Sequence, residues 1–98
     1  MSRVKTKEVI ETLTRELRLP RESILEQGLK AFLEKNLREI KAEIFQITGK
    51  YGVASVEEME RRYKEGTLEE RDSWRDFQQL DHLEYRKEQL EKLLKKLQ

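Results

Sequence analysis

The chain has 98 residues, of which 36% are hydrophobic and 42% are charged, and its formal net charge is +1 at pH 7. Because charged residues make up about a quarter of an average domain, little material is left here for a deep core. We expect one small all-α unit of three to four helices, elongated or oligomeric rather than globular. No cysteine occurs, which excludes disulfides, thiolate metal sites and cysteine nucleophiles.

The sequence shows no pattern typical of export or membrane insertion. It lacks a run of about 18 apolar residues, and its start, MSRVKTKEV, has no apolar centre. We therefore expect a cytoplasmic protein without membrane contacts. The chain holds 17 Glu and 11 Lys but a single Asn, a bias typical of thermophile proteins.

Charge is distributed in three blocks. Residues 1–21 carry six basic and three acidic residues, and residues 86–98 carry five basic and two acidic residues. Between them, residues 57–84 carry five basic and ten acidic residues. The basic ends suit an anionic partner and the acidic middle suits a cationic one. The alternative is that these blocks are solvated helix faces with ion pairs four residues apart.

The N-terminal half, residues 1–52, predicts a helix over about 5–18 and a long helix over about 20–48. Residues 1–6 are either frayed or a brief strand. The long helix begins either with Pro20 in its first turn or with a cap at Ser23, and Gly49 is a candidate C-terminal cap.

Apolar residues in the long helix recur at steps of three and four, which predicts one amphipathic stripe. Its 29 residues at about 1.5 Å each would form a rod of roughly 43 Å. Because such a rod is longer than a small domain is wide, we expect a coiled-coil-like homodimer through this stripe. The dimerisation residues we expect are Leu29, Phe32, Leu33, Leu37, Ile40 and Ile44.

Residues 53–98 predict two further helices. The patterns Ser55-Val-Glu-Glu58 and Thr67-Leu-Glu-Glu70 resemble capping boxes, so we expect helices over about 56–65 and about 68–97. On the last helix, six leucines share one face, at positions 80, 83, 90, 93, 94 and 97, whereas Trp74, Phe77 and Tyr85 fall on the opposite side. Either the helix bends near Asp81 and both sets are core, or the aromatic side chains dock another protein.

The docking alternative predicts a partner-binding surface in this half, because aromatic residues are enriched at the centres of interfaces. Acidic neighbours would meet Lys or Arg of the partner. The anchors we expect are Trp74, Phe77, Asp81 and Tyr85, with Asp72, Asp76 and Glu84 supplying further charge.

No group of residues in the sequence suggests catalysis. His82 is the single histidine, and with Asp81 and Glu84 it forms at most an opportunistic metal site. The segment from Gly49 to Gly52 is too short for a phosphate loop. We expect no enzymatic activity, no metal and no cofactor.

Nucleic-acid binding is a weaker expectation. The candidate phosphate contacts are Arg3, Lys5, Lys7 and Arg15. Acidic residues interrupt this patch at positions 8, 11 and 16, and no aromatic residue lies among the bases to stack on nucleotides.

Two resemblances follow from these patterns. The segment VIETLTRELRLPRESILEQGLKAFLEKNL, residues 9–37, resembles the two-helix part of ribbon-helix-helix (CopG-like) proteins, in which a DNA-reading strand precedes the first helix. Only residues 2–6 stand in that place here, so we carry over no base-contacting residue. The resemblance implies a dimer and a DNA-binding ancestry.

The remainder resembles antitoxin-like partners of type II toxin–antitoxin pairs. The matching segments are Lys50-Tyr-Gly-Val53, Ser55-Val-Glu-Glu-Met59, Glu65-Gly66 and the acidic-aromatic helix with its leucine-rich end. This resemblance implies that the C-terminal helix covers a basic surface of a cognate toxin, such as a nuclease. The alternatives are a DNA-binding regulator of ribbon-helix-helix ancestry and a non-catalytic helical adaptor.

Overall fold

The structure is a computed structural model that describes residues 3–98, with side chains described from residue 5 onward. It consists of four helices, α1 (Arg3–Leu17), α2 (Arg21–Tyr51), α3 (Val56–Glu65) and α4 (Glu70–Lys96), and the described residues contain no strand. The all-α fold with two long helices is therefore confirmed.

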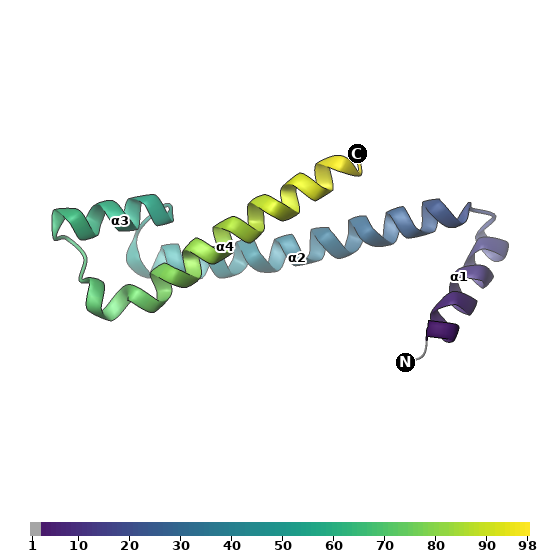
Figure 1. Ribbon diagram of the computed structural model, residues 1–98, viewed down its shortest axis with the longest axis horizontal. Helices are drawn as coiled ribbons and strands as arrows, with labels where there is room; N and C mark the ends of the chain where they lie inside the picture. Colours follow the sequence, from purple (N-terminus) through teal and green to yellow (C-terminus); the bar gives the residue numbers. More distant parts are fainter. Residues whose placement is uncertain (1–2) are drawn as a thin grey trace.

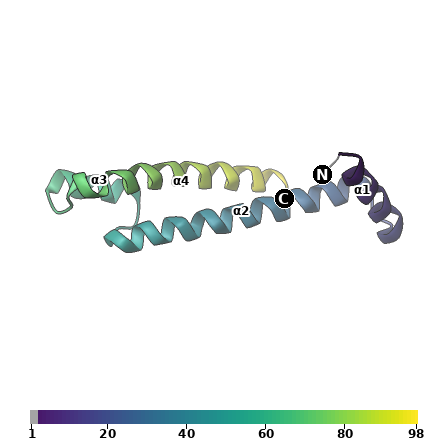
Figure 2. The same cartoon turned by 90° about the horizontal axis from the view of Figure 1, so that it is seen from below.

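The helices form an elongated molecule. As Figures 1 and 2 show, α4 runs back antiparallel beside the C-terminal half of α2, α3 lies at the turn between them, and α1 projects from the far end of α2. The chain measures 62 × 29 × 16 Å and its radius of gyration is 19.8 Å. A compact domain of this length would have a radius of gyration of about 13 Å. The expected elongated shape is confirmed.

The core is small and lies where α2, α3 and α4 meet. Among the described residues, its buried hydrophobic side chains are Ile40, Ile47, Val53, Met59, Leu80 and Leu83. The predicted N-terminal and C-terminal regions both contribute to it, because the leucine face of α4 packs on the apolar stripe of α2. The two regions are therefore parts of one packed unit.

A sharp corner separates α1 from α2. Arg18, directly after α1, has φ of 54°, a left-handed conformation that costs a residue with a side chain about 1 kcal/mol or more. Pro20 then precedes the first turn of α2, and no side chain caps that helix. The alternative start with a cap at Ser23 is therefore wrong. The helix begins one residue after Pro20, which is its extended N-cap residue rather than part of its first turn.

The long helix continues three residues beyond its predicted end. Its cap is Gly52, whose φ of 64° suits glycine and whose N–H donates to the Thr48 carbonyl. Gly49 was the expected cap, but it lies inside the helix. Both Gly49 and Gly52 could end the helix by local sequence alone. Gly52 is the cap because the chain turns toward α3 only after Tyr51.

The two predicted capping boxes have different outcomes. Ser55 caps α3, since its hydroxyl accepts from the Glu58 N–H at 3.2 Å. The Thr67 box is wrong: Thr67 donates its hydroxyl to the Arg62 carbonyl at the end of α3, and α4 begins only at Glu70. From there α4 is one uninterrupted helix to Lys96, so the alternative of a break near Asp81 is not realised.

Candidate partner-binding site

The exposed aromatic surface of the C-terminal half is built by the first turns of α4 against α3. The Trp74 ring stacks on Phe77 with centroids 5.4 Å apart and an interplanar angle of 18°, and Phe77 in turn meets Tyr63 of α3 at 5.5 Å. Phe77 is half-buried, whereas Trp74 remains 43% exposed. The indole is therefore exposed to solvent on one side and stacked on a half-buried ring on the other. We call Tyr63, Trp74 and Phe77 the aromatic cluster.

A buried hydroxyl fixes the base of this cluster. Ser73 is 1% exposed, its Oγ donates to the Glu69 carbonyl at 2.7 Å, and it also lies 2.6 Å from the Tyr63 hydroxyl. Both polar atoms are thus satisfied inside an apolar contact between α3 and α4. These hydrogen bonds position the Tyr63 ring, which contacts Phe77 and so supports the aromatic cluster.

An open hollow with acidic residues lies beside the cluster. Glu60, Lys64 and Glu70 line it together with the three aromatic side chains. Glu60 pairs with Lys64 at 3.8 Å, and Glu58 and Glu65 also form ion pairs within four residues along α3. Part of the acidic block is therefore a solvated helix face. Among the described residues no ion pair involves Glu70, so its charge remains available at the hollow.

Asp76 has an internal role. Its Oδ2 accepts a hydrogen bond from the Tyr51 hydroxyl and lies 3.0 Å from Lys50 Nζ, so it joins α4 to the last turn of α2. These hydrogen bonds, that of Tyr51 first, hold the pKa of the Asp76 carboxyl below its ordinary value. Burial, and next the bond to Asp76, raise the pKa of Tyr51. Asp76 therefore fixes one helix against another rather than facing outward.

Glu84 is also used within the chain. Its Oε2 accepts from the Val56 N–H at 2.9 Å, which satisfies one of the free amides in the first turn of α3. A carboxylate at that position also interacts favourably with the positive end of the helix dipole. Asp76 and Glu84 were predicted to meet a partner, and the structure instead shows them stabilising the contacts of α4 with α2 and α3.

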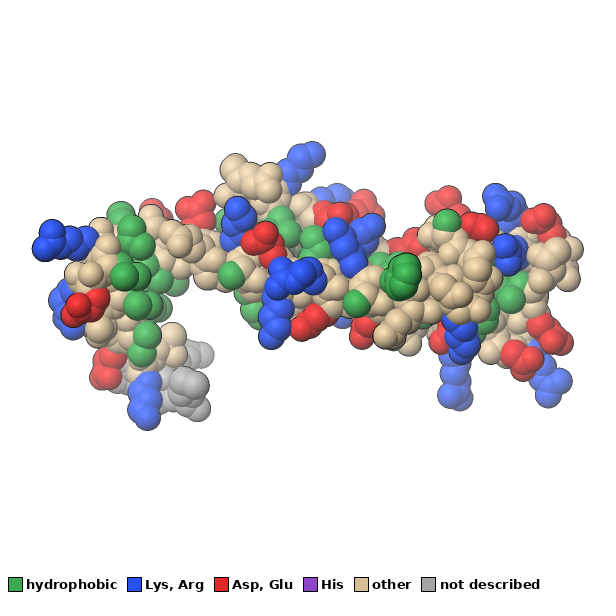
Figure 3. Space-filling model, turned by 180° about the vertical axis from the view of Figure 1, so that it is seen from behind, with side chains coloured by type: hydrophobic (Ala, Val, Ile, Leu, Met, Phe, Trp, Pro, Cys, Tyr) green, Lys and Arg blue, Asp and Glu red, His purple; other side chains and the backbone are tan. Residues whose placement is uncertain are grey.

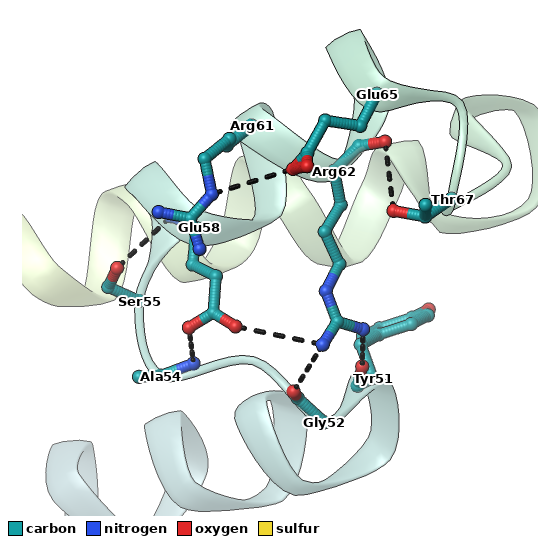
Figure 4. Close-up of polar contacts among 9 residues, drawn as sticks. All are labelled: Tyr51, Gly52, Ala54, Ser55, Glu58, Arg61, Arg62, Glu65 and Thr67. Atoms are coloured by element: carbon teal, nitrogen blue, oxygen red, sulfur yellow. Dashed lines mark hydrogen bonds and ion pairs between the residues drawn. The ribbon is translucent and has the colours of Figure 1, made fainter.

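The turn between α2 and α3 is held by a polar network, shown in Figure 4. Arg62 donates to the carbonyls of Tyr51 and Gly52, at 3.1 Å each, and lies 3.7 Å from Glu58. Glu58 also accepts from the Ala54 N–H at 2.8 Å. The network closes the chain reversal and so fixes α3 against the end of α2.

The remaining predicted site residues are exposed, but they do not share one face of α4. Asp72 lies two residues before Trp74 and so on the opposite side of the helix. Tyr85 is 61% exposed, and Asp72 and Asp81 are exposed as well. Asp81 and Tyr85 are four residues apart and so share a helix face, with Trp74 on the same side of the helix. The structure thus brings Trp74, Asp81 and Tyr85 to one face, which we call the outer α4 face. It separates them from Asp76 and Glu84.

The predicted dimerisation residues divide into two groups. Ile40 is 3% exposed and Ile44 packs against the core, so both are occupied by contacts within the chain. Leu29 and Phe32 are 54% and 62% exposed. Half-buried Leu33 and Leu37 lie between these groups. The prediction that Ile40 and Ile44 contact a second chain is therefore wrong, because α4 already covers that part of the stripe.

The candidate phosphate contacts do not form a uniform basic face. Lys5, Lys7 and Arg15 are exposed on α1, and the Arg3 side chain lies outside the described residues. Glu11 follows Lys7 by four residues and precedes Arg15 by four, so it stands between them in one column of the helix. Residues 1–6, expected to be frayed or a brief strand, are helical from residue 3 onward, and residues 1–2 lie outside the described residues.

Two groups were missed as site residues by the sequence interpretation. Tyr63 was not among the predicted site residues, and its contact with Phe77 depends on tertiary packing. The exposed apolar residues Val9, Leu13 and Leu17, which share one face of α1, were not predicted as site residues either. Their spacing gave the signal of an apolar face but could not indicate that this face would lack an intrachain partner.

The fold and the site define an elongated all-helical protein that offers aromatic and apolar surfaces. Within residues 3–98 no cluster of side chains suits a metal ion, and no described helix has both the length and the apolarity needed to cross a bilayer. All 98 residues match one family profile, and the chain belongs to that family, the uncharacterized protein MJ0235 family. No curated protein and no solved structure matches the chain.

Proposed function

We propose that this protein is an antitoxin-like inhibitor that binds a cognate toxin, such as a nuclease, and covers its basic active surface. The single observation that supports this most strongly is the exposed indole of Trp74 on the aromatic cluster. An exposed aromatic side chain that is already stacked on a neighbour makes an effective anchor, because the stacking limits the side-chain entropy lost on binding.

The charge around the anchor favours a cationic partner. Residues 57–84 carry ten acidic and five basic residues. Asp81 is exposed on the outer α4 face, and Glu70 lines the hollow beside the aromatic cluster. A nuclease binds a polyanion and so presents a basic surface, which acidic side chains would steer toward this end of the molecule. Inhibition by covering the toxin surface needs no catalytic group on the inhibitor. We propose that the toxin and its inhibitor act in the cytoplasm.

The structural roles of Asp76 and Glu84 support the same proposal indirectly. Both hold α4 in place against α2 and α3, so the outer α4 face is formed before any partner arrives. A preformed helix does not lose the ordering entropy that a disordered inhibitory segment would lose on binding. The outer α4 face is therefore suited to tight association.

The test begins with affinity capture from the source organism, followed by binding measurements with the purified partner. Trp74→Ala is expected to weaken binding by about 30-fold, the effect of losing about 2 kcal/mol at a hot spot. Tyr85→Ala is expected to weaken it in the same direction. Phe77 is left unchanged because its half-buried ring supports the fold.

Phe45→Ala provides the matched control, since Phe45 is 77% exposed on α2 and lies outside the aromatic cluster and the outer α4 face. The control should retain the parental affinity, and the captured partner should lose its toxic activity when the parent chain is added. Undiminished binding by the Trp74→Ala, Tyr85→Ala double variant would refute the proposed surface. A captured partner with no activity to inhibit would refute the antitoxin role.

A further inference from the structure

The apolar stripe of α2 is covered along only half of its length. Ile40 and Ile47, opposite α4, are 3% and 8% exposed, whereas Leu25, Leu29 and Phe32 are 41%, 54% and 62% exposed. The last turns of α4 reach α2 beside Leu37, Arg38 and Lys41, where Leu94 lines a hollow with them. Beyond that point the same stripe continues without a covering helix.

A second open stripe lies on α1. Val9, Leu13 and Leu17 recur every four residues on one face and are 57%, 37% and 57% exposed. Figure 3 shows hydrophobic side chains gathered along α1, on the projecting end of the molecule. We call these two stripes the open hairpin face: Val9, Leu13 and Leu17 of α1 with Leu25, Leu29 and Phe32 of α2. Large apolar surfaces of this kind mark interaction sites.

The whole extended chain exposes more surface than a compact monomer would, by an amount larger than one side of a stable interface. The chain has 8038 Å² of accessible surface, whereas a compact monomer of 11.9 kDa would have about 5,900 Å². The excess is about 2,100 Å² per chain. Standard interfaces bury about 800 Å² on each partner, and obligate homodimers commonly bury more. The extended shape therefore leaves enough surface for an obligate interface.

The charge around the face favours a second copy over an anionic partner. Residues 5–35 contain seven Lys or Arg and six Glu, so two such surfaces can approach without strong net repulsion. Nucleic-acid binding would instead require an excess of positive charge on one face. A twofold axis would also place identical apolar stripes against each other, which satisfies the self-complementarity of an isologous interface.

We infer that the open hairpin face is a homodimer interface, in which two α1–α2 corners pack around a twofold axis. Each chain contributes Val9, Leu13, Leu17, Leu25, Leu29 and Phe32. The α4 helix ends the contact near Leu37, so the outer α4 faces of both copies stay accessible. This inference does not depend on the toxin-binding proposal.

Sedimentation analysis of the full chain tests the inference, with an expected mass of twice 11.9 kDa at micromolar concentration. Leu17→Glu and Phe32→Glu are each expected to raise the dimer dissociation constant about 100-fold or more, because every substitution acts twice in a symmetric interface. Phe45→Glu is the control, since Phe45 is more exposed than either residue but lies away from the open hairpin face. It should remain dimeric.

Because a variant that loses the dimer could also lose its fold, cysteine cross-linking provides an independent measurement. The chain has no native cysteine, so Phe32→Cys and Phe45→Cys each carry a single thiol. A short bismaleimide linker should join two chains at position 32 and not at position 45. A monomeric parent up to millimolar concentration would overturn the inference and assign the face to a different protein. A dimer cross-linked at position 45 alone would overturn it as well.

Discussion

Leu80→Ala is expected to lower the free energy of unfolding by about 3 kcal/mol, the usual cost of a large-to-small change at a fully buried leucine. Leu80 is 0% exposed and belongs to a core of six buried hydrophobic residues, counted among those described, at the junction of α2, α3 and α4. A chain of this length has a total stability of about 5–15 kcal/mol. With so few buried residues, this one substitution should remove a large share of the total.

Urea unfolding monitored by circular dichroism and by tryptophan fluorescence would measure this loss. Trp74 is the single tryptophan and stacks on Phe77, so its emission reports the packing of α3 on α4. Leu93→Ala, on the same helix but with Leu93 45% exposed, should cost less than about 1 kcal/mol. All variants must be compared at one chain concentration, because association would shift the midpoint. Equal losses for the two variants would refute the described packing of α4.

Two further predictions concern the end of α2. Asp76→Asn should cost about 1 kcal/mol at neutral pH, since it weakens the hydrogen bonds from Tyr51 and Lys50. Because the folded-state pKa of Asp76 is lowered, its contribution is present above the ordinary carboxyl pKa of 3.8 and is lost as the pH falls through the folded value. The stability difference between parent and variant, measured by urea unfolding from pH 7 to pH 2, should therefore shrink below about pH 4, and a constant difference would contradict this role. Gly49→Ala should stabilise the chain by about 0.5–1 kcal/mol, because Gly49 lies inside α2 with nothing within 4 Å of an added Cβ. Gly52→Ala should destabilise it by about 1 kcal/mol, because its φ is 64°. Opposite shifts of the thermal midpoints would confirm which glycine caps the helix, and shifts of the same sign would contradict it.

The fold class was predictable because helix formation in this chain is governed by local pattern. Apolar steps of three and four, the single proline and the Ser55 capping box all act within a few residues, and they predicted four helices close to those observed. The errors occurred where two local signals competed. Gly49 and Gly52 are both plausible caps by sequence, and Thr67 resembles an N-terminal cap although it closes the preceding helix.

The candidate site was predictable in part. The helical wheel of α4 separated Trp74 and Tyr85 from the leucine stripe, and both are exposed in the structure. It could not distinguish the acidic residues that face solvent from those with internal partners. Asp76 contacts Tyr51 and Lys50, which precede it by 25 and 26 positions in the chain. Glu84 accepts from the Val56 amide, which precedes it by 28 positions. Contacts over such separations leave no local pattern in the sequence.

The sequence by itself determined that this protein is helical, elongated and poor in core residues, because periodicity and composition act on every segment independently of its neighbours. Only the tertiary structure decided which stretch of the α2 stripe is occupied. The antiparallel return of α4 buries Ile40 and Ile47 and leaves Leu25, Leu29 and Phe32 open. The physical reason is that an apolar stripe encodes a need for burial but not the partner that satisfies it, and that partner is set by the path of the whole chain.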